Sequence, residues 1–150
     1  MDAVTYPQEA VIDFINQNLV PLRVGSDEQP MAKDFDIRWT PALLILDRDG
    51  KEHHRTVGFM EPTELISSLL LGIGKMHYDA GAFKEAIASF ERIAAEYPWS
   101  DSAPEAIFLT GVSGYKSTHQ ALPLKESYEH LRKAYPQSPW TKRAYPYRLL

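Results

Sequence analysis

The chain has 150 residues, of which 44% are hydrophobic and 24% are charged, a balance typical of a folded globular protein. No run approaches the ~18 apolar residues of a membrane span, and residues 1–25 lack a signal-peptide pattern, so we expect a cytoplasmic protein without a membrane partner. The absence of cysteine excludes disulfides, thiolate metal sites and thiol catalysis by these 150 residues.

The net charge of -4 is divided unevenly along the chain. Residues 1–66 carry six Lys/Arg against twelve Asp/Glu, whereas residues 67–150 carry ten against eight. An acidic front half argues against nucleic acid as a partner. The back half ends in a basic tail, which indicates either a solvated helix face or an anionic partner; its residues are Arg132, Lys133, Lys142, Arg143 and Arg148.

The first predicted element is a helix within residues 6–18. Val11, Phe14 and Ile15 form one apolar stripe there, and Pro7 is tolerated at the entrance of a helix. The stripe indicates a core-facing helix.

A short strand is predicted next, at residues 19–24. Pro21 within it implies an edge position, because proline cannot donate to a ladder. Residues 25–30 predict a polar loop, and residues 31–35 predict one or two helical turns.

A hairpin is predicted at residues 42–59. The continuous apolar run 42–47 is typical of a central strand with both sheet faces covered. Residues 47–50 supply turn chemistry, with Gly50 able to take a positive φ, and the return strand comes next. The turn aspartates lack the other ligands of a calcium loop.

A helix is predicted at residues 61–81, with Pro62 near its start and Gly81 at its end. It carries two adjacent stripes: Leu65, Leu69, Ile73 and Met76 in one, and Ile66, Leu70 and His77 in the other. A helix that is apolar on two sides packs on two sides. We therefore expect it to be both the last helix of a front unit and the first helix of a second, helical unit.

The remaining sequence repeats itself. Residues 89–98 align with residues 127–136 at an offset of 38, and Gly74 and Tyr78 align with Gly111 and Tyr115 at 37. Offsets of this size are typical of helical repeats. Two helices carry heptad-like apolar spacing, with Phe83, Ala86, Ile87, Phe90 and Ile93 in one and Leu124, Tyr128 and Leu131 in the other. Pro146 should end a third, shorter helix.

The front of the chain resembles a thioredoxin-like domain. The resemblance is carried by "DIRWTPALLILDRDG" at residues 35–49, by "TVGF" at 56–59 and by the helix after them. It implies a cis bond before Pro41. It also implies that the C-x-x-C and the strand before it would lie ahead of Met1. The two remaining strands would then pair directly, or a strand of a second copy would fill the gap.

Residues 67–150 resemble tetratricopeptide-type repeats, on Leu70, Gly74, Ala86, Phe90 and Pro98. The predicted fold class is therefore α/β plus α: a partial thioredoxin-like α/β unit at residues 1–66, followed by tetratricopeptide-like helix-hairpin repeats at residues 67–150.

The sequence offers little catalytic chemistry. His53 and His54 are adjacent, so on a strand they would point to opposite faces and could not share a metal. Asp34 and Asp36 lie in a hydrated stretch, and "GIGK" at residues 72–75 lacks the remainder of a phosphate loop. We predict no catalytic residue, metal or cofactor.

A binding surface is better supported. The resemblance implies that a peptide adds as a strand beside the cis-proline, with Trp39, Thr40, Pro41, Gly58 and Phe59 as the peptide-binding residues. The alternative is that Trp39 fills a core gap and Pro41 shapes a turn. Four side chains of the helical half, Tyr78, Tyr115, Tyr128 and His77, either form a second surface or pack between helices.

These observations predict a redox-inactive thioredoxin-like protein with helical repeats that acts as a protein- or peptide-binding adaptor. The alternative is a fragment of a thiol-disulfide oxidoreductase whose C-x-x-C lies upstream of Met1. A homodimer whose association fills the vacant place in the sheet is a further hypothesis.

Overall fold

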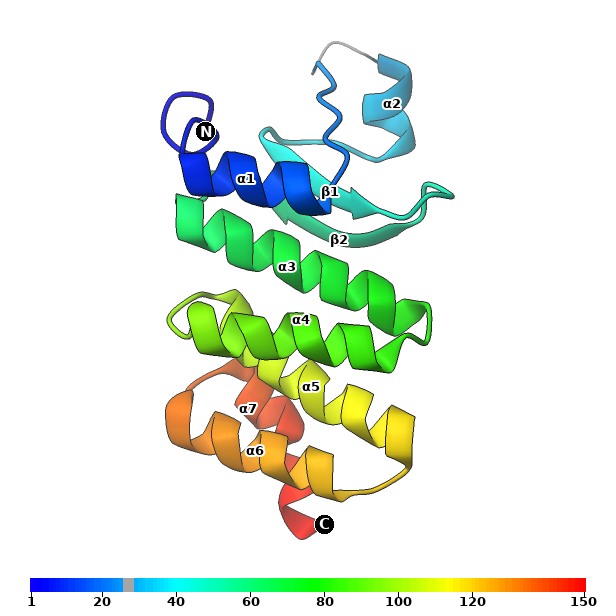
Figure 1. Cartoon of the computed structure of the whole chain (residues 1–150), viewed down its shortest axis with the longest axis vertical. Helices are drawn as coiled ribbons and strands as arrows, with labels where there is room; N and C mark the ends of the chain where they lie inside the picture. The colour runs from blue at the N-terminus through cyan, green and yellow to red at the C-terminus, as the bar shows by residue number, and fades with distance from the viewer. Residues whose placement is uncertain (26–28) are drawn as a thin grey trace.

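The computed structural model describes residues 1–25 and 29–150 and shows an α/β unit followed by a helical region, as predicted (Figure 1). Residues 26–28 of the polar loop expected at residues 25–30 lie outside the described residues, whereas Gln29 and Pro30, also expected in that loop, begin α2. The elements are α1 (Glu9–Asn18), α2 (Gln29–Asp34), β1 (Ala42–Leu46), β2 (Glu52–Val57), α3 (Pro62–Asp79), α4 (Phe83–Glu96), α5 (Ser102–Thr118), α6 (Leu122–Ala134), α7 (Pro139–Ala144) and a 3-10 helix, η1 (Tyr145–Leu149).

The strands β1 and β2 form the predicted antiparallel hairpin. Its register runs from Ala42 opposite Val57 to Leu46 opposite Glu52, and a β-bulge at Ile45/Leu46 leaves His53 as the extra residue. The turn is closed by an Asp47 carboxylate oxygen, which accepts from the backbone N–H groups of Asp49 and Lys51, each at 2.9 Å. Gly50 takes the positive φ, at 81°.

Two strand predictions are wrong. Residues 19–24 form no strand, and they do not pair with the hairpin. Residues 42–47 do not form a central strand covered on both faces, because in the described part of the chain β1 pairs with β2 alone and only Ile45 of β1 is buried. Both predictions assumed a neighbouring strand, and an apolar extended sequence becomes a ladder only where such a neighbour exists.

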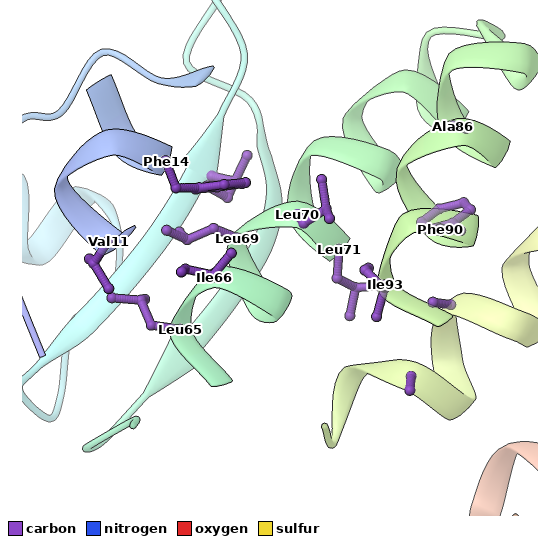
Figure 2. Packing of buried hydrophobic residues seen from close by; sticks show 13 residues of the cluster. Val11, Phe14, Leu65, Ile66, Leu69, Leu70, Leu71, Ala86, Phe90 and Ile93 are labelled. Carbon is purple, nitrogen blue, oxygen red and sulfur yellow. The ribbon is translucent and has the colours of Figure 1, made fainter. Parts of the chain in front are cut away.

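Helix α3 lies between the two parts of the molecule and packs on both sides (Figures 1 and 2). Figure 2 shows Leu65, Ile66 and Leu69 directed toward α1, while Leu70 and Leu71 lie on the side of α4. One buried cluster therefore runs from Val11 and Phe14 through α3 to Phe90 and Ile93. The predicted division between residues 66 and 67 falls inside this helix and stays a prediction.

The helices after the sheet stack as consecutive hairpins, with α3 against α4, α4 against α5 and α5 against α6. Two glycines allow this close packing: a Cβ on Gly74 would meet the ring of Phe90, and one on Gly111 would meet the side chain of Ser127. Helix α7 ends at Ala144, two residues before Pro146, as predicted. No helix in residues 1–25 and 29–150 combines the length and apolar character needed to cross a bilayer.

Candidate functional site

Four of the five predicted binding residues meet at one end of the hairpin. The Gly58 N–H donates to the Pro41 carbonyl at 2.8 Å, one step beyond the Ala42–Val57 pair. The Thr40–Pro41 peptide bond is cis, the isomer that the resemblance implies. Gly58 has a φ of 104°, where a side chain would strain the backbone. The hydrogen bond between Gly58 and Pro41 closes this end of the hairpin, with Thr40 just before β1 and Phe59 just after β2.

The two aromatic side chains of this set are exposed. Trp39 is 77% exposed and Phe59 is 56% exposed. The alternative in which Trp39 fills a core gap is therefore wrong. Exposed aromatic side chains at the end of a sheet offer apolar contact area to a partner.

Strand β1 has an open edge, which we define as the backbone N–H and C=O groups of Ala42, Leu44 and Leu46. Because Pro41 and Gly58 are a hydrogen-bonded pair, the alternation of an antiparallel ladder makes Leu43 and Ile45 the residues whose backbone groups face β2. The intervening backbone groups point away from β2. Within residues 1–25 and 29–150, the sheet has no third strand to receive them.

The side chains of these edge residues lie on the face of the sheet away from α3. A Cβ on Gly72 of α3 would meet Ile45 Cγ1 at 2.5 Å, so Ile45 faces the helix. Successive strand side chains alternate, and Leu44 therefore faces the opposite side. Its partner on β2 is Arg55, on that same face.

Arg55 holds the stretch that leads to Trp39. Its guanidinium donates to the carbonyl of Phe35 at 2.6 Å and pairs with the Glu52 carboxylate at 2.6 Å. The charged hydrogen bonds raise the pKa of Arg55 and lower that of Glu52. Sequence reasoning missed this anchor, because the residues that it joins lie far apart in the chain and no local pattern connects them.

Residues 20–24 follow α1 as an extended segment that forms no ladder (Figure 1). Val20 is 97% exposed and Leu22 is 76% exposed, and both rank among the most exposed large hydrophobic side chains of the described residues. Arg23 forms an exposed ion pair with Asp2 at 2.9 Å. The predicted strand sequence is thus present, apolar and without a strand partner in the described part of the chain.

His53 binds two carboxylates. Its Nδ1 lies 2.7 Å from Asp79 and its Nε2 lies 2.9 Å from Asp47, and its side chain is 3% exposed. Both ring nitrogens can donate to the two carboxylates at once only when the ring is protonated. Burial alone would lower the pKa of His53, but the hydrogen bonds to Asp47 and Asp79 outweigh it and raise that pKa above its ordinary value.

His54 lies in a different environment. Its Nε2 is 3.0 Å from Ser68 Oγ, and Lys75 Nζ, which can only donate, is 3.4 Å from its Nδ1. Lys75 in turn pairs with Glu105 of α5 at 2.6 Å. Burial and the charge of Lys75 lower the pKa of His54 from 6.5 to about 4, so the ring is neutral near pH 7 and its Nε2–H donates to Ser68.

The prediction that the two histidines point to opposite faces is wrong, since His53 and His54 both contact α3. The bulge at His53 breaks the two-residue alternation on which the prediction rested. The two rings share no ligand. No group of three or more His, Asp or Glu side chains that could hold a metal ion occurs in residues 1–25 and 29–150.

The predicted aromatic residues of the helical half differ in how far they are exposed. Tyr78 packs edge-on against Phe83, with ring centroids 5.6 Å apart, and Tyr128 is only 7% exposed. Tyr115 is more exposed than Tyr128, with 39% of its surface accessible. The basic tail is partly occupied within the chain, because Arg143 lies over Trp140 at 4.4 Å and Arg148 over Tyr145 at 3.9 Å.

Comparison with known proteins finds a similarity for the N-terminal part of the chain. Residues 2–71, somewhat less than half of the chain, match the family model of the thioredoxin-like domain, so the hairpin and its flanking helices are similar to that domain. The match ends within α3, and the helices after it lie outside it. No curated protein and no solved structure matches the chain.

Proposed function

We propose that this chain is a protein- or peptide-binding adaptor that performs no thiol chemistry of its own. The observation that carries the proposal is the open edge of β1, at whose start Pro41 bonds to Gly58; the exposed Trp39 precedes Pro41 in the chain and the exposed Phe59 follows Gly58. The thioredoxin-like unit supplies the frame, and the 150 residues contain no cysteine with which to exchange disulfides.

Recognition would proceed by strand addition. An extended partner segment would pair its backbone with Ala42, Leu44 and Leu46, which gives affinity without demanding a particular sequence. Trp39 and Phe59 would contact apolar partner side chains at the end where Pro41 meets Gly58. These contacts favour apolar, unfolded segments as partners.

The helical half would hold this edge rigidly. We propose that its hairpins are tetratricopeptide-like, because Gly74 and Gly111 play the same part in two successive hairpins. Lys75, on α3, links His54 of the sheet to Glu105 of α5. A partner bound at β1 would therefore be carried on a stack of helices whose other faces remain free for a second contact.

The test uses an unfolded protein as the probe. Reduced, carboxymethylated α-lactalbumin is titrated into the chain by calorimetry, and binding is expected. A Trp39→Ala/Phe59→Ala variant should bind it about tenfold more weakly or worse, because interface aromatic side chains carry much of the affinity. The matched control is Trp99→Ala, since Trp99 is 73% exposed but lies between α4 and α5.

Equal binding by the Trp39/Phe59 variant and the Trp99 variant would refute the proposed site. Redox inactivity is tested separately with insulin and dithiothreitol. The chain should leave the rate of insulin reduction unchanged, and any acceleration would refute the non-catalytic part of the proposal.

A further inference from the structure

We propose that two copies of this chain exchange strands, so that residues 20–24 of each copy pair with β1 of the other. Two observations carry the proposal. The edge of β1 has no strand partner in the described residues, and residues 20–24 are an exposed, apolar, extended stretch of the same chain. Each element has five residues, so each strand spans about 17 Å.

Pro21 determines which backbone groups of the segment face β1. A proline in a ladder must direct its missing N–H away from the neighbouring strand. The groups that face β1 are then those of Val20, Leu22 and Val24, since backbone direction alternates along a strand. The segment therefore has one usable edge, as β1 does.

The two edges match residue by residue in the antiparallel direction. Val24 lies opposite Ala42, Leu22 opposite Leu44 and Val20 opposite Leu46 of the other copy. Directly opposite residues share a face of the sheet, so these three pairs each join two apolar side chains. The intervening pairs place Pro21 opposite Ile45 and Arg23 opposite Leu43, so no two charges meet. A parallel arrangement would lose these direct pairs.

A second copy explains the exposed surface better than a strand from another protein. A foreign strand would occupy β1 but leave Val20 and Leu22 of this chain in water. Reciprocal exchange covers both elements in both copies and closes with twofold symmetry. In the structure the segment does not pair with β1 of its own copy, and it stays beside the end of α1, where the Leu19 N–H donates to the Ile15 carbonyl at 2.8 Å and Arg23 pairs with Asp2.

The exchange uses the same open edge as the proposed adaptor function but does not require that function to be correct. A partner strand and a second copy would compete for the same backbone groups. Cross-linking tests the exchange alone, whereas binding of unfolded α-lactalbumin tests the adaptor function alone, so the two failures are distinguishable.

The absence of native cysteine makes cross-linking specific. A Leu22→Cys/Leu44→Cys variant, oxidised in air, should give a covalent dimer on a non-reducing gel, with the 22–44 linkage identified by mass spectrometry. Residues directly opposite in a ladder lie at about 5.5 Å between Cα atoms, within disulfide reach. A disulfide within one chain would overturn the proposal, because it would show the segment pairing with its own β1.

A second pair guards against a folding defect at Leu44. Val24→Cys/Ala42→Cys should also give the dimer, whereas Val24→Cys/Leu46→Cys, which tests the parallel direction, should not. Absence of a dimer from both antiparallel pairs, or a dimer from the parallel pair alone, would overturn the proposal.

The unmodified chain supplies an independent measurement. Sedimentation from about 1 µM to about 1 mM should show a monomer–dimer equilibrium, and Leu22→Asn should raise its Kd about tenfold or more because each dimer loses two apolar pairs. Ile12→Asn is the control, since Ile12 is 44% exposed on α1 and outside the exchanged strands. A monomer throughout the range, or an equal effect of both substitutions, would overturn the exchange.

Discussion

The sheet end and the helical end of this molecule differ in how completely they cover their own apolar surface. Of the sixteen exposed large hydrophobic side chains in the described residues, ten belong to residues 1–66, although this part is the shorter. The helical end instead packs closely enough that Gly74 and Gly111 leave no space for a Cβ. One end therefore covers its apolar residues by its own packing, and the other presents them at the surface.

The difference arises from where each kind of element finds its hydrogen bonds. A helix pairs its backbone within itself, so a stack of helices needs neighbours only for apolar contact. A strand leaves a row of backbone groups unpaired on any side without a neighbouring strand, and β1 has a neighbour on one side in the described residues. An apolar, extended sequence without such a neighbour is left in water, as Val20 and Leu22 are.

The largest expected effect contrasts two phenylalanines. Phe90 is fully buried in the helical end, and Phe59 is 56% exposed at the sheet end. Phe90→Ala should lower the free energy of unfolding by about 3–5 kcal/mol, because it opens a cavity against Gly74. Phe59→Ala should change it by less than about 0.5 kcal/mol, as exposed substitutions do. Urea denaturation of both variants measures the contrast.

Equal destabilisation by Phe59→Ala and Phe90→Ala would contradict this prediction. That result would mean that Phe59 packs against apolar surface in solution and that the sheet end is as closed as the helical end. The denaturant dependence of the wild-type chain is the reference for both variants.

A second, smaller effect concerns His54 of β2, which contacts Lys75 of α3 at the junction of the sheet end and the helical end. The pKa of His54 falls from 6.5 to about 4 through burial and the charge of Lys75. The unfolded chain then binds the proton more readily, so the contribution of His54 to stability is present above pH 6.5 and is lost as the pH falls to 4. The loss is at most about 3 kcal/mol.

His54→Gln isolates this contribution from the carboxyl groups that titrate in the same range. The stability of the wild type minus that of the variant should decrease steadily between pH 6.5 and pH 4, measured by urea denaturation at each pH. A difference that is independent of pH would show that Lys75 and Glu105 do not enclose a neutral ring.

The elements with strong local signals could be predicted from the sequence. The stripe of Val11 and Phe14 and the Asp-Gly turn depend on residues close in the chain, and both formed as predicted. Helix α3 packs on two sides as predicted, but Ile66 lies with Leu65 and Leu69 on the α1 side and not with Leu70. The strand at residues 19–24 did not form, because a strand depends on a neighbour that local sequence does not describe.

The candidate site divides in the same way. The meeting of Pro41 with Gly58 results from the hairpin register, which the turn at residues 47–50 determines. The bulge at His53 and the partners of Arg55 are long-range consequences of how α3 and the 35–40 stretch pack against β2. No spacing in the sequence predicts them.

The smallest expected effect concerns His53. The pH dependence of its contribution to stability has the opposite sign to that of His54. Hydrogen bonds to Asp47 and Asp79 raise the pKa of His53 above its ordinary value despite burial. The folded chain therefore binds the proton more tightly, and the contribution of His53 is present below pH 6.5 and is lost as the pH rises through the raised pKa. It should be of the order of 1 kcal/mol or less, because the His53 side chain is buried but the side chains of its partners Asp47 and Asp79 are 25% and 39% exposed, so water screens the pairs.

The stability of the wild type minus that of His53→Gln should thus decrease with rising pH, whereas the corresponding difference for His54→Gln increases. Asp79→Asn is the sharper probe, because it removes one carboxylate while leaving Asp47 to close the hairpin turn. Proton NMR titration should then show a lower pKa for His53 and an unchanged one for His54. If both rings responded alike, the two histidines would share one environment, and the contact of His53 with Asp47 and Asp79 would not be separate from the contact of His54 with Ser68 and Lys75.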